Sequence, residues 1–188
     1  MIRSMSTVTS PGKAALLVVD MQGGALANTW NTETAVGNVA GLVDRARANE
    51  IPVVWVRHSS KVMPIGSADW QIVSELKPAP EESIVEKRYG DSFEDTDLAD
   101  VLTELGVTDL VVCGAQSDAC VISTLFGGFV RGYNVALVGD AHTTEDHSAY
   151  GAPPAPQVIE YLNNIWRYRS APDRTASVIT AESFPGQA

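Results

Sequence analysis

The chain has 188 residues and a mass of 20.0 kDa, a length that suits one domain with its own hydrophobic core. Hydrophobic residues make up 45% of it and charged residues 19%, which excludes a disordered or fibrous chain. Thirteen Lys and Arg against 23 Asp and Glu give a net charge of −10, and such a negative field disfavours nucleic acid and anionic membrane surfaces as partners.

The N-terminal segment, the short apolar runs and the two cysteines indicate a protein of the cytoplasm. The first ten residues contain no apolar stretch long enough for a secretory signal, and no apolar run reaches the roughly 20 residues of a membrane span. Cys113 and Cys120 are the two cysteines, too few for a disulfide framework. We expect residues 1–12 to form a flexible tail and residues 13–184 to form one domain in a reducing compartment.

Short apolar runs alternate with amphipathic segments along the chain. The pattern predicts a strand over 14–19, a helix over 34–48, a strand over 52–56, a short helix over 69–76 and a weaker strand over 83–86. A helix over 98–105, for which Thr96 is a candidate cap, leads to a strand over 109–114. A helix over 119–131, a strand over 135–138, a helix over 153–169 and a strand over 176–180 follow. This order predicts an α/β protein, a three-layer α/β/α sandwich around a six-stranded parallel sheet of the Rossmann-like kind.

Three reactive side chains stand at the ends of predicted strands. Asp20 follows the first strand, Lys87 follows the third, and Cys120 lies in the first turn of the helix after the fourth. Because open parallel sheets hold their ligands at the carboxyl ends of the strands, we expect these three to meet at one edge. A helix N-terminus and an ammonium both favour the thiolate form of a cysteine, and a carboxylate can accept its proton. Each residue alone also has a structural explanation, as a turn cap, a solvated charge or a small core residue.

Five segments of the chain together resemble a known family. They are LVVDMQ at 17–22, VVWVRH at 53–58, VEKRYGDSF at 85–93, VCGAQSDACV at 112–121 and GYNVALVGDA at 132–141. This set is similar to the isochorismatase-like cysteine hydrolases, which include nicotinamidases, carbamoylsarcosine amidases and ureidoacrylate hydrolases. The resemblance implies that Asp20, Lys87 and Cys120 form a catalytic triad on a six-stranded parallel sheet.

The resemblance also implies an oxyanion hole and a substrate pocket. Relatives have a cis peptide before the nucleophile, which corresponds here to the bond between Ala115 and Gln116. The backbone N–H groups of Gln116 and Cys120 would then stabilise a tetrahedral intermediate. The residues that stand where relatives line their pockets are Gln22, His58, Trp70 and Phe93. Of these, Trp70 is equally compatible with the core, and His58 with the rim of the pocket.

Neither a metal nor an organic cofactor is expected. Nicotinamidases of the family bind a metal through an Asp and several His after the second strand, where this chain offers His58 alone. His142 and His147 stand far along the chain, so spacing does not bring three imidazoles together. Gly23 and Gly24 do not form the Gly-x-Gly-x-x-Gly pattern of a dinucleotide site.

The expected activity is hydrolysis of an amide or ureido C–N bond in a small molecule, through a covalent thioester-type intermediate on Cys120. Three alternatives stay open. They are cleavage of a vinyl ether such as that of isochorismate, whose hydrolases typically lack this cysteine, hydrolysis of a lactam antibiotic such as streptothricin, and a binding protein without catalysis. Cys113, inside a predicted strand, is expected to be inert.

A homo-oligomer, either a dimer or a tetramer, is the expected assembly, since many relatives form one. Gly127 and Gly128 interrupt a predicted helix at a cost of about 1 kcal/mol each relative to alanine. Close packing against another helix, across a subunit interface for example, would explain them. Tyr161, Trp166 and Tyr168 make the last helix a candidate contact surface.

Overall fold

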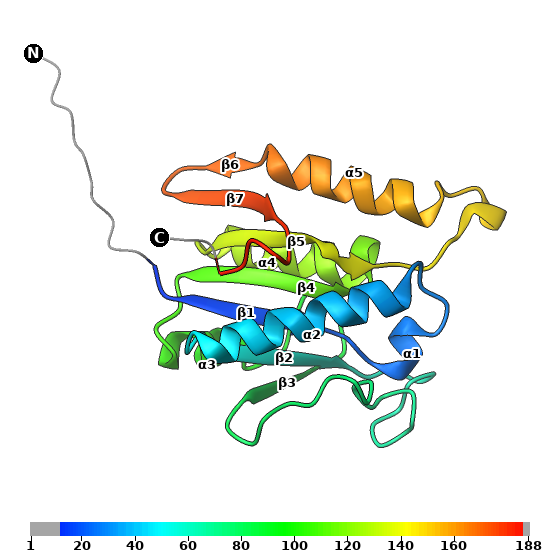
Figure 1. Ribbon diagram of the computed structural model, residues 1–188, viewed down its shortest axis with the longest axis horizontal. Helices are drawn as coiled ribbons and strands as arrows, with labels where there is room; N and C mark the ends of the chain where they lie inside the picture. Colours follow the sequence, from blue (N-terminus) through cyan, green and yellow to red (C-terminus); the bar gives the residue numbers. More distant parts are fainter. Residues whose placement is uncertain (1–11, 186–188) are drawn as a thin grey trace, which may run out of the picture.

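A seven-stranded sheet forms the middle layer of the protein (Figure 1). The computed structural model describes residues 12–185. The strand order across the sheet is β3-β2-β1-β4-β5-β7-β6, and neighbouring strands are parallel except for β6 and β7. The strands are β1 Ala14–Val19, β2 Val53–His58, β3 Ser83–Lys87, β4 Asp109–Ala115, β5 Asn134–Thr143, β6 Ser170–Ala171 and β7 Arg174–Ile179. This sheet confirms the predicted α/β class.

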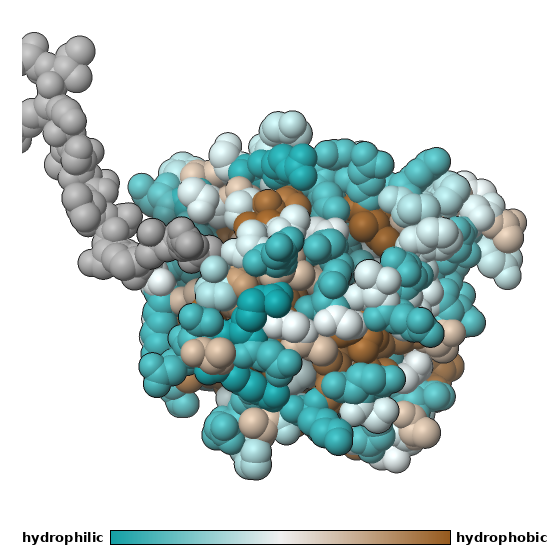
Figure 2. All heavy atoms as spheres, viewed as in Figure 1, coloured by the Kyte–Doolittle hydropathy of each residue, from teal (hydrophilic) through white to brown (hydrophobic). Residues whose placement is uncertain are grey.

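Helices cover both faces of the sheet and complete three layers. They are α1 Gly23–Leu26, α2 Thr32–Ala48, α3 Leu98–Glu104, a π-helical turn over Ser117–Val121, α4 Ile122–Val130, a 3-10 turn over Ser148–Tyr150 and α5 Ala155–Arg167. Residues of α1 and α2 join the apolar cluster on one face, and residues of α3, α4 and α5 join the cluster on the other. In Figure 1, α2 crosses in front of the sheet, and Figure 2 shows that this side of the molecule is mostly hydrophilic.

Burial on both faces explains the uninterrupted apolar sequence of β1. Successive side chains of a strand point to opposite faces of the sheet. Leu16 and Val18 belong to the cluster on the α2 side, whereas Leu17 and Val19 belong to the cluster on the α4 side. Since β2 and β4 flank β1, the chain leaves β1 in one direction and later returns on its other side. Such a switch point is where open parallel sheets bind ligands.

The helix predicted over 69–76 does not form, and that segment is a series of turns. The carbonyl groups of Asp69 and Gln71 accept hydrogen bonds from the first two residues of α1, at 2.8 and 3.0 Å. Val73 donates in turn to the carbonyl of Met21 at 3.0 Å. Pairing with a distant segment therefore satisfies the backbone groups that a local helix would have used.

The predicted number of six strands is wrong by one. β6 has two residues and pairs antiparallel with β7 through Ala171 and Arg174, and two residues are too few to produce a periodic pattern. The other strands occur where predicted, although β5 extends past the predicted end at 138 to Thr143. The four remaining predicted helices correspond to α2, α3, the π-helical turn with α4, and α5. The predicted cap of α3 is wrong by one residue, because Asp97 occupies the N-cap position and makes no side-chain capping bond, whereas Thr96, one residue earlier, accepts the N–H of Leu98 at 3.3 Å.

Residues 1–11 lie outside the described part of the chain, so the predicted tail over 1–12 stays a prediction. Within residues 12–185, none of the helices combines the length and the apolar character needed to cross a bilayer.

Packing within the chain explains the two adjacent glycines of α4. A Cβ atom at Gly127 would lie 2.2 Å from Oδ1 of Asp91, and one at Gly128 would lie 2.8 Å from Cδ1 of Leu110. The close approach is therefore to the segment after β3 and to β4, so these glycines are no evidence for a subunit interface.

Of the three aromatic residues expected at a subunit contact, Trp166 is buried in the core of this chain. That expectation is wrong for Trp166, because its ring packs edge-on against Phe126 and Phe129 of α4. Tyr161 and Tyr168 are exposed. The homo-oligomer stays a prediction.

Gly114 of β4 lies against the backbone of β1 with no room for a side chain. Its φ is +122°, and a Cβ atom there would lie 2.0 Å from the carbonyl oxygen of Val19. We therefore expect Gly114→Ala to lower the free energy of unfolding by about 3 kcal/mol or more. Urea unfolding measures this loss. The matched control is Gly37→Ala in α2, where nothing lies within 4 Å and where alanine should stabilise by about 0.5–1 kcal/mol. Equal stability of the two variants would contradict this account of Gly114.

Candidate active site

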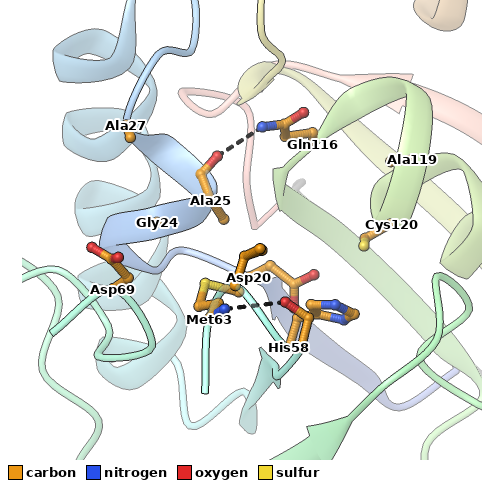
Figure 3. Close-up of a pocket in the computed structure, with 12 residues that line it drawn as sticks. Asp20, Gly24, Ala25, Ala27, His58, Met63, Asp69, Gln116, Ala119 and Cys120 are labelled. Atoms are coloured by element: carbon orange, nitrogen blue, oxygen red, sulfur yellow. Dashed lines mark hydrogen bonds between the residues drawn. The ribbon is translucent and has the colours of Figure 1, made fainter. Parts of the chain in front are cut away.

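The carboxyl ends of four neighbouring strands carry the candidate catalytic groups. Asp20 follows β1, His58 is the last residue of β2, and Lys87 is the last residue of β3. Cys120 lies in the π-helical turn that follows β4. Because these strands are adjacent and parallel, their ends meet at one edge of the sheet. Three of the four residues, all but Lys87, line the cavity drawn in Figure 3.

A buried ion pair joins Asp20 and Lys87. The Nζ atom of Lys87 lies 2.7 Å from Oδ2 of Asp20, and the two side chains are 0% and 2% exposed. Burial raises the pKa of Asp20 above its usual value, and the charge of Lys87 opposes that rise. Burial alone would lower the pKa of Lys87, but attraction to Asp20 and to Cys120 raises it above its ordinary value. Lys87 is therefore a protonated ammonium at neutral pH, and its charge favours the ionised form of Asp20.

The ammonium of Lys87 has three acceptors for its three hydrogens. Besides Asp20, they are the carbonyl oxygen of Tyr89 at 3.1 Å and Nδ1 of His58 at 3.4 Å. Burial and the charge of Lys87 lower the pKa of His58, so we assign a neutral imidazole whose Nδ1 accepts from Lys87. The second carboxylate oxygen of Asp20, Oδ1, has no hydrogen-bond partner among the described residues. That oxygen is the one available to take a proton.

Cys120 is half-buried and lies close to these groups. Its Sγ, a carboxylate oxygen of Asp20 and a ring nitrogen of His58 all lie within 4.8 Å of one another. Burial and the charge of Asp20 raise the pKa of the Cys120 thiol to about 12, and Lys87 opposes only part of this. Lys87 favours the thiolate, as expected, but burial and the charge of Asp20 outweigh it. The resting thiol is neutral, and its proton must leave as the sulfur reacts.

The turn that presents the cysteine is tied to its surroundings at several points. The peptide bond between Ala115 and Gln116 is cis, as the resemblance implies. The carbonyl of Gln116 accepts hydrogen bonds from Ala119 and Val121 at 3.1 and 3.0 Å. Its side-chain amide donates to the carbonyl of Ala25 in α1 at 2.9 Å (Figure 3). The turn and α1 therefore hold each other in place at the cavity.

A buried chain of hydrogen bonds behind this turn is absent from the sequence-based expectations. Ser117 Oγ lies 2.8 Å from Nδ1 of His142, and Nε2 of His142 lies 3.1 Å from Oδ1 of Asn163. Asn163 donates through its Nδ2 to the carbonyl of Gly139 at 3.0 Å. Oδ1 of Asn163 must then accept from Nε2, which leaves Nδ1 to accept the Ser117 hydroxyl. Burial lowers the pKa of His142, consistent with a neutral ring. The only sequence signal was a histidine at the end of an apolar strand.

Of the four predicted substrate-binding residues, His58 lines the cavity, whereas Gln22, Trp70 and Phe93 do not. Both amide hydrogens of Gln22 donate to backbone carbonyls, those of His58 and Trp70, at 2.9 and 2.7 Å. Its Oε1 accepts the N–H of His58 at 2.7 Å. Trp70 is buried beneath the guanidinium of Arg57, 3.8 Å from the ring centroid. Phe93 is part of the apolar core on the α4 side. The three predictions are wrong for this cavity because each side chain has a structural role.

The cavity itself has a volume of about 400 Å³, which suits a small molecule. Its walls come from α1, from the segment between β2 and β3, and from the π-helical turn. Apolar contacts come from Ala25, Ala27, Val62, Met63 and Ala119. The sequence pattern does not predict these walls, because it indicates no element over 23–26 and favours a helix over 69–76, where the structure has turns.

The residues best placed to hold a metal are those of the same cluster, Asp20, His58 and Cys120. The ammonium of Lys87 lies beside two of them, at 2.7 Å from Asp20 and 3.4 Å from His58. A positive charge at that distance repels a cation. The arrangement therefore suits proton transfer better than metal binding, and the lack of a metal stays a prediction.

Cys113 is more deeply buried than Cys120 and does not line the cavity. It is 0% exposed, and its Sγ lies 3.8 Å from the carbonyl oxygen of Leu17. Burial raises the pKa of its thiol far above the ordinary value. This burial supports the expectation that Cys113 is unreactive, which stays a prediction.

Comparisons with known proteins identify relatives of this chain. Residues 14–153 match the family model of the isochorismatase domain. A streptothricin hydrolase from Streptomyces noursei is 35% identical over 180 residues, which covers 89% of this chain and 69% of that protein. The chain spans 57% of a second enzyme of the same name and organism. Nicotinamidase 3 from Arabidopsis thaliana is 28% identical, over 74% of this chain and 77% of the relative.

A solved structure has the same fold. The crystal structure of an isochorismatase from Pseudomonas putida KT2440 matches with a TM-score of 0.82 and 31% identity, over 91% of this chain and 89% of that one. The family model covers most of the sheet, including the strand ends that carry Asp20, Lys87 and Cys120. Sequence and fold agree, and the protein belongs to the isochorismatase family of hydrolases.

Proposed function

We propose that this protein is a cysteine-dependent hydrolase that cleaves an amide or ureido C–N bond in a small molecule. The observation that carries the proposal is the meeting of Asp20, Lys87 and Cys120 beside a cavity of about 400 Å³. Relatives named streptothricin hydrolase and nicotinamidase support an amide substrate.

In the first half of the reaction, Sγ of Cys120 attacks the carbonyl carbon of the substrate. Oδ1 of Asp20, which has no other partner among residues 12–185, accepts the thiol proton as the C–S bond forms. The tetrahedral intermediate carries its negative charge on oxygen, where the backbone N–H groups of Gln116 and Cys120 stabilise it. Asp20 then gives its proton to the leaving nitrogen, the C–N bond breaks, and ammonia or an amine departs.

In the second half, water hydrolyses the thioester or thiocarbamate on Cys120. Asp20 accepts a proton from the water as its oxygen attacks the acyl carbon. The C–S bond breaks, the acid product leaves, and the proton on Asp20 returns to the sulfur. Lys87 stays protonated throughout and favours the carboxylate form of Asp20 between the two proton transfers.

The alternatives make different chemical demands. A lactam antibiotic is an amide, so streptothricin, the substrate in the name of a 35% identical relative, is the second candidate substrate. A vinyl-ether hydrolase has no use for the thiol of Cys120. A binding protein without catalysis would not need the thiol of Cys120 to lie beside a carboxylate oxygen of Asp20.

A covalent adduct is the direct sign of the proposed reaction. We expect ammonia or amine release from one member of a panel of amides and ureides, and an acyl adduct on Cys120 by mass spectrometry after acid quench. Cys120→Ala should lose at least about a thousandfold in kcat, as triad nucleophiles do. The control Cys113→Ala should keep its activity. Full hydrolysis by Cys120→Ala would refute the mechanism.

The pH dependence should report the ionisation of Asp20. Since burial raises the pKa of this carboxyl, we expect activity to fall on the acid side at a pH above the ordinary aspartate value. Lys87→Met removes the charge that opposes this rise, so the acid limb of kcat/KM should move to still higher pH while kcat falls. Lys61→Met, which removes an exposed lysine of the loop after β2, should leave the limb in place. An acid limb unmoved by Lys87→Met would contradict the role given to the ion pair.

His142 should act as a positioning residue for the oxyanion turn. His142→Leu removes the acceptor of the Ser117 hydroxyl, and a displaced oxyanion donor should lower kcat about tenfold or more with a smaller change in KM. His142→Gln keeps a donor and an acceptor and should restore part of the rate. His147→Gln is the control, because His147 takes no part in this hydrogen-bond chain, and its kcat should stay unchanged. If His142→Leu and His147→Gln have the same kcat, the turn does not depend on His142.

A further inference from the structure

Within the described part of the chain, acidic residues line the cavity of the candidate active site, and lysines and arginines do not. The residues that line the cavity include two acidic ones, Asp20 and Asp69, and no Lys or Arg of residues 12–185 is among them. The remaining polar side chains of the lining are uncharged, including the imidazole of His58, whose lowered pKa favours the neutral ring. The cavity therefore offers a carboxylate-bearing ligand no cationic partner.

Lys87, Arg57 and Lys61 belong to segments next to the cavity, but none of them lines it. Lys87 is paired with Asp20 and fully buried. Arg57 is paired with Glu86 and lies over the ring of Trp70. Lys61 belongs to the loop that forms one wall, but its side chain is exposed and does not line the cavity.

Asp69 is an exposed acidic residue among those that line the cavity. It is exposed and takes part in no ion pair within the described residues. Its backbone is fixed, because its carbonyl accepts the N–H of Gly24 at 2.8 Å. A Cβ atom at Gly24 would lie only 2.9 Å from the Cβ of Asp69, so the two segments are in close contact. In Figure 3, Asp69 and Cys120 lie on opposite sides of the cavity.

This geometry gives the two ends of a bound substrate different environments. The scissile carbonyl must lie at Cys120, next to the neutralised pair of Asp20 and Lys87. A substrate long enough to cross the cavity brings its far end to the side where Asp69 lies, past the lining residues Ala25 and Met63. A positive group there gains an ion pair, and a negative group meets an uncompensated carboxylate in a molecule of net charge −10.

We propose that the site selects amides that carry a cationic group away from the scissile bond and discriminates against amides that carry a carboxylate there. Asp69 is the specificity-determining residue. This inference rests on the proposed function, since it assigns the substrate class of the same site.

Three amides of equal chain length separate the effect of charge from that of shape. They are 6-aminohexanamide, hexanamide and adipamate, which carry a positive, a neutral and a negative distal end. We expect kcat/KM to fall in that order, with about tenfold or more between the first and the last at low ionic strength. Asp69→Asn should reduce this ratio at least threefold, chiefly through KM for 6-aminohexanamide. Asp100→Asn removes the same charge from an exposed position of α3, and this control should leave the ratio unchanged.

A second readout does not depend on amide turnover. Methanethiosulfonates transfer a thioalkyl group to the sulfur of Cys120 and release methanesulfinate. The trimethylammonioethyl reagent should modify Cys120 faster than the sulfonatoethyl reagent, and Asp69→Asn should bring the two rates together. Mass spectrometry of the peptides distinguishes Cys120 from the unreactive Cys113.

The two readouts separate the two claims. If no amide is hydrolysed but the cationic reagent is favoured in an Asp69-dependent way, the proposed function fails and the charge selection stands. Equal labelling rates, faster labelling by the anionic reagent, a preference for adipamate, or a ratio unchanged by Asp69→Asn would overturn the charge selection.

Discussion

The buried ion pair of Asp20 and Lys87 is the interaction on which the rest of the candidate site depends. Removing two charges from water costs several kcal/mol for each ion, and their attraction seldom leaves a net gain in stability. An apolar pair would fill the same space at less cost. The pair therefore makes sense as chemistry, because it places an ionised carboxylate with one unpartnered oxygen beside a neutral thiol.

The sheet makes this pair possible. Parallel pairing of β3, β2, β1 and β4 puts the ends of four strands side by side, although the residues they carry are far apart in the sequence. Strand ends are rigid, since both faces of the sheet are covered by apolar clusters. The substrate walls have another origin, because they come from α1, the turns after β2 and the π-helical turn. Fixed chemistry on the strands and variable walls on the connections suit a family whose members act on different molecules.

The sequence predicts what is decided locally and misses what is decided by distant contacts. The strand over 14–19 is predictable because burial on both faces leaves a continuous apolar run, and Asp20 and Lys87 are then found at strand ends. The segment over 69–76 is not predictable from its own pattern, because its carbonyls serve α1.

The same limit applies to the predicted side-chain roles. Gln22 has the polarity of a substrate contact, but its amide ties two backbone segments together. The pKa of the Cys120 thiol depends on burial that no local pattern records, and this burial outweighs the effect of Lys87 that the sequence suggests. His142 needs partners from the π-helical turn and α5, so its role emerges only in three dimensions.

The central claim is that Cys120, Asp20 and the oxyanion turn act on one carbonyl carbon. A crystal structure of the protein treated with hexanal, the aldehyde analogue of hexanamide, tests this most directly. The account predicts a bond from Sγ of Cys120 to the aldehyde carbon, with the new oxygen against the N–H groups of Gln116 and Cys120 and a carboxylate oxygen of Asp20 within hydrogen-bond distance of the adduct. An unmodified Cys120, or an adduct whose oxygen faces solvent away from that turn, would contradict it.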